Sequence, residues 1–106
     1  MITVTTETIE GREIAEVLGL VRGNTIRARN MGRDIMAGLR NIVGGEIKDY
    51  TRMLSQARDQ ALERMIRDAE AKGADAVVGM RFTTSQTMAG AAEILAYGTA
   101  VRLRER

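Results

Sequence analysis

One long amphipathic stretch, residues 46–72, constrains the fold of this chain most. Its apolar side chains recur every three or four residues, and charged side chains occupy the opposite positions, as in a helix with one buried face. Two pairs in which an acidic residue precedes a basic residue by four positions also favour a helix. These pairs are Glu63/Arg67 and Asp68/Lys72. Because Gly73 is a natural residue to follow a helix end, the sequence predicts a helix that stops at about residue 72.

Strands are expected after this helix. Residues 76–83 alternate in the manner of a strand, and residues 92–103 form a second such run, with small polar residues 85–90 between them. The expected faces are Ala76, Val78, Met80 and Phe82 on the first strand, and Leu95, Tyr97, Val101 and Leu103 on the second. The pattern therefore predicts a β-hairpin.

The first part of the chain indicates two strands and a further helix. Residues 13–21 are apolar on both faces, as in a strand buried on both sides, and the pair Gly23-Asn24 is expected to form a turn. Residues 2–5 predict a short strand, with a turn at residues 10–12. Helical spacing over residues 31–43 predicts a helix that ends at Gly44-Gly45. The order β, β, α, α, β, β predicts an α+β fold, an antiparallel sheet covered by helices, in one domain over residues 1–106.

Composition narrows the function. The 106 residues include no Cys and no His, which removes thiolate chemistry, the usual general base near neutral pH and the commonest transition-metal ligands. We therefore predict no enzymatic activity and no cofactor. With three aromatic residues the core must consist of small aliphatic side chains, so sharing apolar surface between subunits would compensate. No membrane span or signal peptide is evident, and a cytoplasmic location is expected.

Two segments carry a family resemblance: residues 33–50, RDIMAGLRNIVGGEIKDY, and residues 73–80, GADAVVGM. Together they resemble the YbjQ family of small bacterial and archaeal proteins. The resemblance implies a dodecin-like β-α-β-β subunit that assembles into a closed homopentameric ring. The family carries a heavy-metal-binding label, but carboxylates and carbonyls, the ligands left to this chain, suit hard cations such as Mg²⁺ or Ca²⁺.

The resembling block also holds the candidate site. Adjacent basic and acidic residues in the first turn of a helix can pair across a subunit interface, or they can bind a ligand. The double glycine is expected to form a tight turn, with anion binding at the following helix as the alternative. The predicted ligand-binding or interface network consists of Arg33, Asp34, Arg40, Asn41, Gly44, Gly45 and Tyr50.

An oligomer interface is expected in two places. The short strand at the N-terminus is β-prone and too far from the next strand for a tight hairpin, so we expect it to pair with the sheet edge of a neighbouring subunit. Gly38 inside a predicted helix suggests a close contact that leaves no room for a Cβ. The predicted interface residues are Ile2, Thr3, Val4, Thr5 and Gly38.

Other patterns favour ordinary structural roles. The basic residues between Arg22 and Arg40 accompany a single acid, Asp34, yet no aromatic residue offers base stacking, which disfavours nucleic acid as a partner. The methionines are expected to fill the core. The sequence thus favours a homopentameric scaffold or a protein that binds a small molecule. Carboxylate-based binding of a metal ion is the alternative, and a ring-shaped nucleic-acid binder is the third hypothesis.

Overall fold

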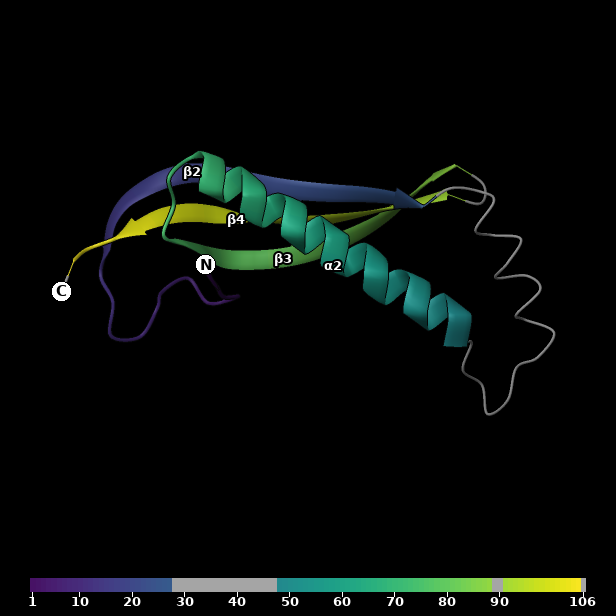
Figure 1. The fold of residues 1–106 in the computed structure, drawn as a ribbon, viewed down its shortest axis with the longest axis horizontal. Coiled ribbons are helices and arrows are strands. Elements are labelled where there is room, and N and C mark those ends of the chain that lie inside the picture. The colour runs from purple at the N-terminus through teal and green to yellow at the C-terminus, as the bar shows by residue number, and fades with distance from the viewer. Residues whose placement is uncertain (28–47, 89–90, 106) are drawn as a thin grey trace.

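The structure is a computed structural model that describes residues 1–27, 48–88 and 91–105. In these residues one helix packs on a four-stranded mixed sheet (Figure 1). The elements are β1 (Ile2–Thr3), β2 (Ile14–Arg27), α2 (Lys48–Ala71), β3 (Ala76–Met88) and β4 (Ala91–Leu103). The predicted α+β class is confirmed, whereas the predicted helix over residues 31–43 lies outside the described residues.

The sheet has the order β1-β3-β4-β2, so β1 and β2 form its two edges. Strand β4 pairs antiparallel with both β2 and β3, and β1 pairs parallel with β3. The predicted hairpin is confirmed, but its strands run further into the polar segment than expected. Residues 85 and 86 still pair with β4, because polar side chains are tolerated on strands that extend beyond the core.

Helix α2 covers one face of this sheet and crosses it diagonally (Figure 1). Four side chains of α2 make the contact with the sheet, three of them small and one large. They are Ala57, Ala61, Met65 and Ala69, and all are fully buried. They pack with Val21 of β2 and with Ala96 and Ala100 of β4 in the main core cluster. The predicted core roles of Met65 and Met80 are confirmed, since both are buried.

Gly23 does not form the expected turn. Strand β2 continues to Arg27, and Gly23 pairs with Ala96 within the ladder between β2 and β4. A Cβ on Gly23 would lie 2.3 Å from the carbonyl oxygen of Ala61 and 2.3 Å from the nitrogen of Met65. Glycine is therefore present because the backbone of α2 approaches β2 closely, which the residue pair Gly23-Asn24 could not reveal.

The predicted alternation of β3 is wrong beyond Val78. The pairing of β3 with β4 shifts between Val78 and Arg81, and Gly79 within this bulge has a φ of 62°. As a result Val78 belongs to a second core cluster, whereas Met80 joins the cluster under α2. A bulge adds one residue to a strand and so exchanges the faces of all later side chains.

The second core cluster lies at one end of the opposite sheet face. It contains Ala76, Val78, Val101 and Leu103, and side chains of the N-terminal segment pack against it. These covering side chains are Val4, Ile9 and Ile14. The turn expected at residues 10–12 is confirmed, because the Arg12 N–H donates to the Ile9 carbonyl (3.1 Å) and Gly11 has a φ of 78°.

Gly73 ends α2 as the sequence predicts. The Gly73 N–H donates to the Glu70 carbonyl (3.0 Å) and the Ala74 N–H to the Ala69 carbonyl (3.1 Å), the bond pattern of a Schellman cap. Gly73 has a φ of 75°, in the left-handed region.

Replacing Gly73 by alanine should therefore lower the free energy of unfolding by about 1 kcal/mol, the cost of a Cβ in this conformation. Gly73→Asn should cost less, because asparagine tolerates the left-handed region. Urea denaturation of both variants measures the difference. Equal losses would argue that crowding, rather than backbone conformation, selects glycine at this position.

Candidate functional site

The structure leaves most of the predicted ligand-binding or interface network untested. Arg33, Asp34, Arg40, Asn41 and the pair Gly44-Gly45 lie outside the described residues, as does Gly38 of the predicted interface. Tyr50 lies in the first turn of α2. The described residues instead present two other features: a sheet face with exposed apolar side chains, and a cavity at one end of the sheet.

The exposed apolar side chains lie on the sheet face that is turned away from α2. The N-terminal segment covers one end of this face, and the remainder is exposed. Residues directly opposite each other in a ladder share a face, and here Val17 is opposite Val101, Leu20 opposite Thr99 and Ile26 opposite Glu93. We call this surface the open face. Its residues on β2 include Val17, Leu20 and Ile26, which are 65%, 63% and 56% exposed. Leu95 and Tyr97 of β4 lie beside them and are half-buried.

The two edge strands differ in whether the backbone groups on their outer side already form hydrogen bonds. On β2, side chains of α2 occupy the outer edge, because Asp68 Oδ2 accepts from the Arg22 N–H (3.1 Å) and Arg64 Nη1 donates to the Asn24 carbonyl (2.6 Å). On β1, the Val4 N–H donates to the Val77 carbonyl, and the Val4 carbonyl accepts from the Met80 N–H. The backbone groups of Thr3 therefore point away from β3 and remain available for pairing.

The predicted interface strand thus pairs first with its own chain. Ile2 lies opposite Ala76 and Thr3 opposite Val77 in a parallel ladder, which covers only the start of the β3 edge, because β3 runs on to Met88. Pairing with a neighbouring subunit would use the outer side of β1. That contact remains a prediction.

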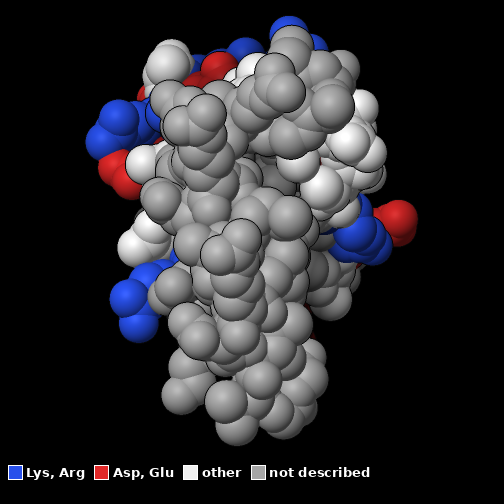
Figure 2. Space-filling view, turned by 90° about the vertical axis from the view of Figure 1, so that its right-hand side faces the viewer, with Lys and Arg blue, Asp and Glu red and all other residues white. Residues whose placement is uncertain are grey.

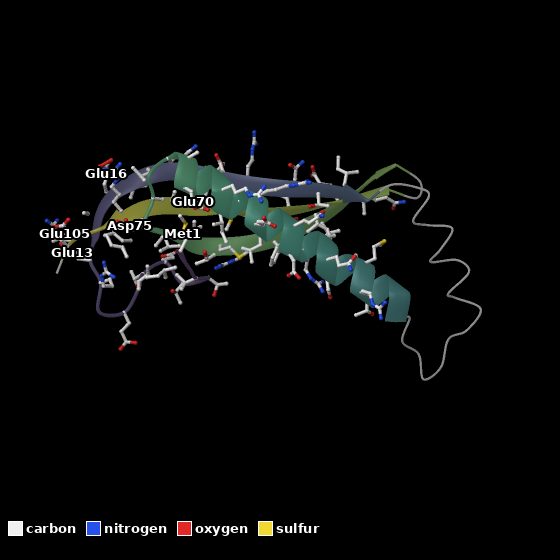
Figure 3. The ribbon with its side chains drawn as sticks, viewed as in Figure 1. Met1, Glu13, Glu16, Glu70, Asp75 and Glu105 are labelled. Atoms are coloured by element: carbon white, nitrogen blue, oxygen red, sulfur yellow. The ribbon has the colours of Figure 1, made fainter. Side chains whose placement is uncertain are left out.

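The cavity lies where β4 ends and α2 turns into β3. It has a volume of about 500 Å³ and is lined by residues from four separate segments. Arg12 comes from the turn before β2, Gly73 and Asp75 from the α2–β3 connection, Arg102 from β4, and Glu105 from the chain after β4. Figure 3 shows Asp75 and Glu105 at this end of the molecule.

Charged residues elsewhere on the described surface alternate in sign. Basic and acidic side chains lie next to one another at the margins of the end view in Figure 2. Ion pairs join Arg67 to Glu63, and Arg104 to Glu13 with 3.0 Å between the charged atoms. This mixture differs from the single-signed surface that binds polyanions. Most of the basic segment between Arg22 and Arg40 lies outside the described residues.

Carboxylates in the described part are dispersed. Glu7, Glu10, Glu13 and Glu16 are all exposed. Among residues 1–27, 48–88 and 91–105, no three acidic side chains gather closely enough to hold a metal ion. No helix in this part of the chain is both long and apolar enough to cross a membrane.

Within residues 1–27, 48–88 and 91–105 the fold is of the α+β class, with one helix packed on a mixed four-stranded sheet. A family model described as "Putative heavy-metal-binding" matches residues 1–104. The chain belongs to this family, the YbjQ family, as its central block of residues suggests. The sequence contains no thiolate and no imidazole, so methionine thioethers and oxygen atoms are the metal donors that its side chains offer.

Relatives of similar length support the assignment. A UPF0145 protein of Archaeoglobus fulgidus is 68% identical over 98% of this chain and 96% of its own length. A UPF0145 protein of Methanosarcina acetivorans is 59% identical, with both chains covered completely. A solved structure from Pediococcus pentosaceus, a protein of unknown function in the DUF74 family, superposes with a TM-score of 0.65 at 18% identity, and the match covers 98% of each chain. This likeness shows the fold.

Proposed function

We propose that this chain is a non-enzymatic, cytoplasmic protein that assembles into a homopentamer and serves as a scaffold or binds a small molecule. The exposed apolar surface of the open face carries the assembly part of the proposal. The number five comes from the resemblance to the YbjQ family. The described residues offer no ligand set that favours the metal-binding alternative.

The sequence of β2 supports a covered open face. Residues 13–21 are apolar on both faces, which is typical of strands buried on both sides. Within one subunit the α2 side of this strand is buried and much of the other side is exposed, since Val21 is fully buried whereas Leu20 is 63% exposed. An exposed apolar surface of this kind is typical of a site of interaction with another molecule. A second copy of the chain would bury them.

Charge on the open face is compatible with a second copy as the partner. Arg22 and Arg81 both lie opposite Tyr97 in the ladders, and Glu93 lies opposite Ile26. Both signs of charge therefore border the same apolar surface. The subunits of a closed ring are related by rotation. A rotated second copy can therefore place its acidic residues against the basic residues of the first.

The double variant Leu20→Arg/Ile26→Glu tests this assembly. Placing charges in a buried subunit contact costs several kcal/mol, so the variant should dissociate to smaller species while its far-ultraviolet circular dichroism stays unchanged. The matched control is Arg58→Glu/Arg67→Glu on the exposed side of α2, which should keep the oligomer. Light scattering measures the mass. A wild-type monomer, or a double variant that retains the wild-type mass, would refute assembly through the open face.

A further inference from the structure

Two arginine side chains face the same cavity without an acidic partner. The cavity wall includes Arg12 and Arg102, and no ion pair between described residues involves either guanidinium. Other arginines of the described part do form such pairs, for example Arg104 with Glu13. Arginine is planar and has five donors, which matches the oxygens of a carboxylate or a phosphate.

The Nε atom of Arg12 is the most informative group. It is buried and has no hydrogen-bond acceptor among the described residues. A buried N–H without an acceptor is costly, and nearly all such groups in folded proteins have a partner. This atom is covered by protein atoms, so a ligand oxygen in the cavity would supply the missing acceptor only after a small shift of the Arg12 side chain.

Arg102 is placed for the same purpose. Its Nε donates to the Gly73 carbonyl over 3.3 Å, a long bond that leaves the terminal nitrogens of the guanidinium unused among the described residues. Arg102 Nη2 lies 2.9 Å from the position that a Cβ on residue 73 would occupy. The glycine of the helix cap therefore also makes room for this guanidinium.

Two acidic residues on the cavity wall refine the ligand class. Asp75 is held in place because its Oδ2 accepts the Leu103 N–H at 2.8 Å, and Glu105 lies on the same wall. Two arginines and two acids give the wall no net charge. A simple anion would meet the acids without compensation, whereas a ligand that also carries an ammonium group would satisfy both signs.

We propose that this cavity binds a small zwitterionic molecule, with its phosphate or carboxylate group against Arg12 and Arg102 and its amino group towards Asp75 and Glu105. The volume of about 500 Å³ falls within the range of small-molecule sites. This inference rests on the small-molecule part of the proposed function. It does not depend on assembly, because one chain supplies all the named residues.

The arginine Nε–H groups report binding directly in a ¹H–¹⁵N NMR titration. O-phosphoethanolamine is the first probe, and sodium chloride at equal ionic strength is the control. The Arg12 and Arg102 Nε–H signals should move together and saturate with O-phosphoethanolamine, while those of Arg58 and Arg67 should follow ionic strength alone. Equal responses of all four signals to both solutes would overturn the site.

Substitutions of single arginines distinguish binding in the cavity from a general effect of lost positive charge. Arg12→Gln and Arg102→Gln should each weaken binding of O-phosphoethanolamine roughly tenfold or more, the loss expected for a charge-assisted hydrogen bond. Arg104→Gln is the matched control, because Arg104 is close in sequence but pairs with Glu13, and its affinity should stay within about twofold of the wild type. Wild-type affinity in both Arg12→Gln and Arg102→Gln would refute the assignment.

Two further ligands, ethyl phosphate and glycine, test the two ends of the bound molecule. Ethyl phosphate lacks the amino group of O-phosphoethanolamine and should bind several-fold more weakly, and equal affinity would refute the role of the acids. Glycine and O-phosphoethanolamine differ in their oxyanion, so the tighter of the two identifies carboxylate or phosphate as the preferred group. Absence of saturable binding by both would overturn the proposal. Light scattering on the same samples reports assembly separately, so failure of the pentamer and failure of the cavity remain distinguishable.

Discussion

Replacing Gly23 by alanine is expected to lower the melting temperature by roughly 5–15 °C. The new Cβ would meet two backbone atoms of α2, the Ala61 oxygen and the Met65 nitrogen, each at 2.3 Å. Backbone atoms cannot rotate away as a side-chain end can, so the whole helix must shift. Such overpacking costs about 1–3 kcal/mol, and 1 kcal/mol corresponds to about 4–8 °C in a domain of this size. Alanine also restricts the unfolded chain, but that gain is smaller, about 0.4–1 kcal/mol.

Thermal unfolding followed by circular dichroism measures this effect. Glu16→Ala on the same strand is the matched control, because its side chain is exposed. That variant should melt within a few degrees of the wild type. If Gly23→Ala also melts at the wild-type temperature, the close approach of α2 to β2 is not a property of the protein in solution.

Deleting residues 1–5 is expected to destabilise the subunit and to shift the protein towards species smaller than a pentamer. The deletion removes the bonds between Val4 and β3 and uncovers the second core cluster, which contains Val78 and Val101. Full burial of a valine contributes about 1.5–3 kcal/mol, of which the partly buried Val4 supplies a fraction, and each hydrogen bond contributes about 0.5–1.5 kcal/mol, partly offset by the entropy of the freed residues. A net loss of about 1–3 kcal/mol follows. Loss of the outer edge at Thr3 would weaken contact with a neighbour.

Urea denaturation and light scattering separate the two effects. Val4→Asp keeps the backbone pairing but places a charge against the second cluster, so it should lower stability without removing the outer edge of β1. Glu7→Ala, at an exposed position, is the control and should change neither property. An unchanged pentamer after the deletion would mean that other contacts carry the interface.

The local sequence pattern was sufficient to predict those elements whose buried face follows the helical or strand period. The spacing of Ala57, Ala61, Met65 and Ala69 predicted the buried face of α2, and Gly73 predicted its end, because both features depend on residues within one or two turns. The alternation of residues 92–103 predicted β4 for the same reason. The family assignment also came from the sequence, through a block of residues that lies mostly outside the described structure.

The roles of Gly23 and of the two cavity arginines depend on contacts between residues far apart in the sequence. Gly23 resembled a turn residue, but the backbone of a helix about forty positions later explains it. Arg12 and Arg102 are ninety positions apart and share no motif, so only the end of β4 and the turn before β2 bring them to one cavity.

The sequence by itself determined the α+β class, the position and buried face of α2, the hairpin of β3 and β4, and the absence of thiolate and imidazole chemistry. These follow from residue type and from periods of two or 3.6 residues, which the backbone imposes locally. Only the tertiary structure decided the strand order, the bulge at Gly79, the exposed side of β2 and the cavity with its two arginines. Each of these depends on which segments meet in space, because burial and charge pairing are properties of neighbours that the chain order does not specify.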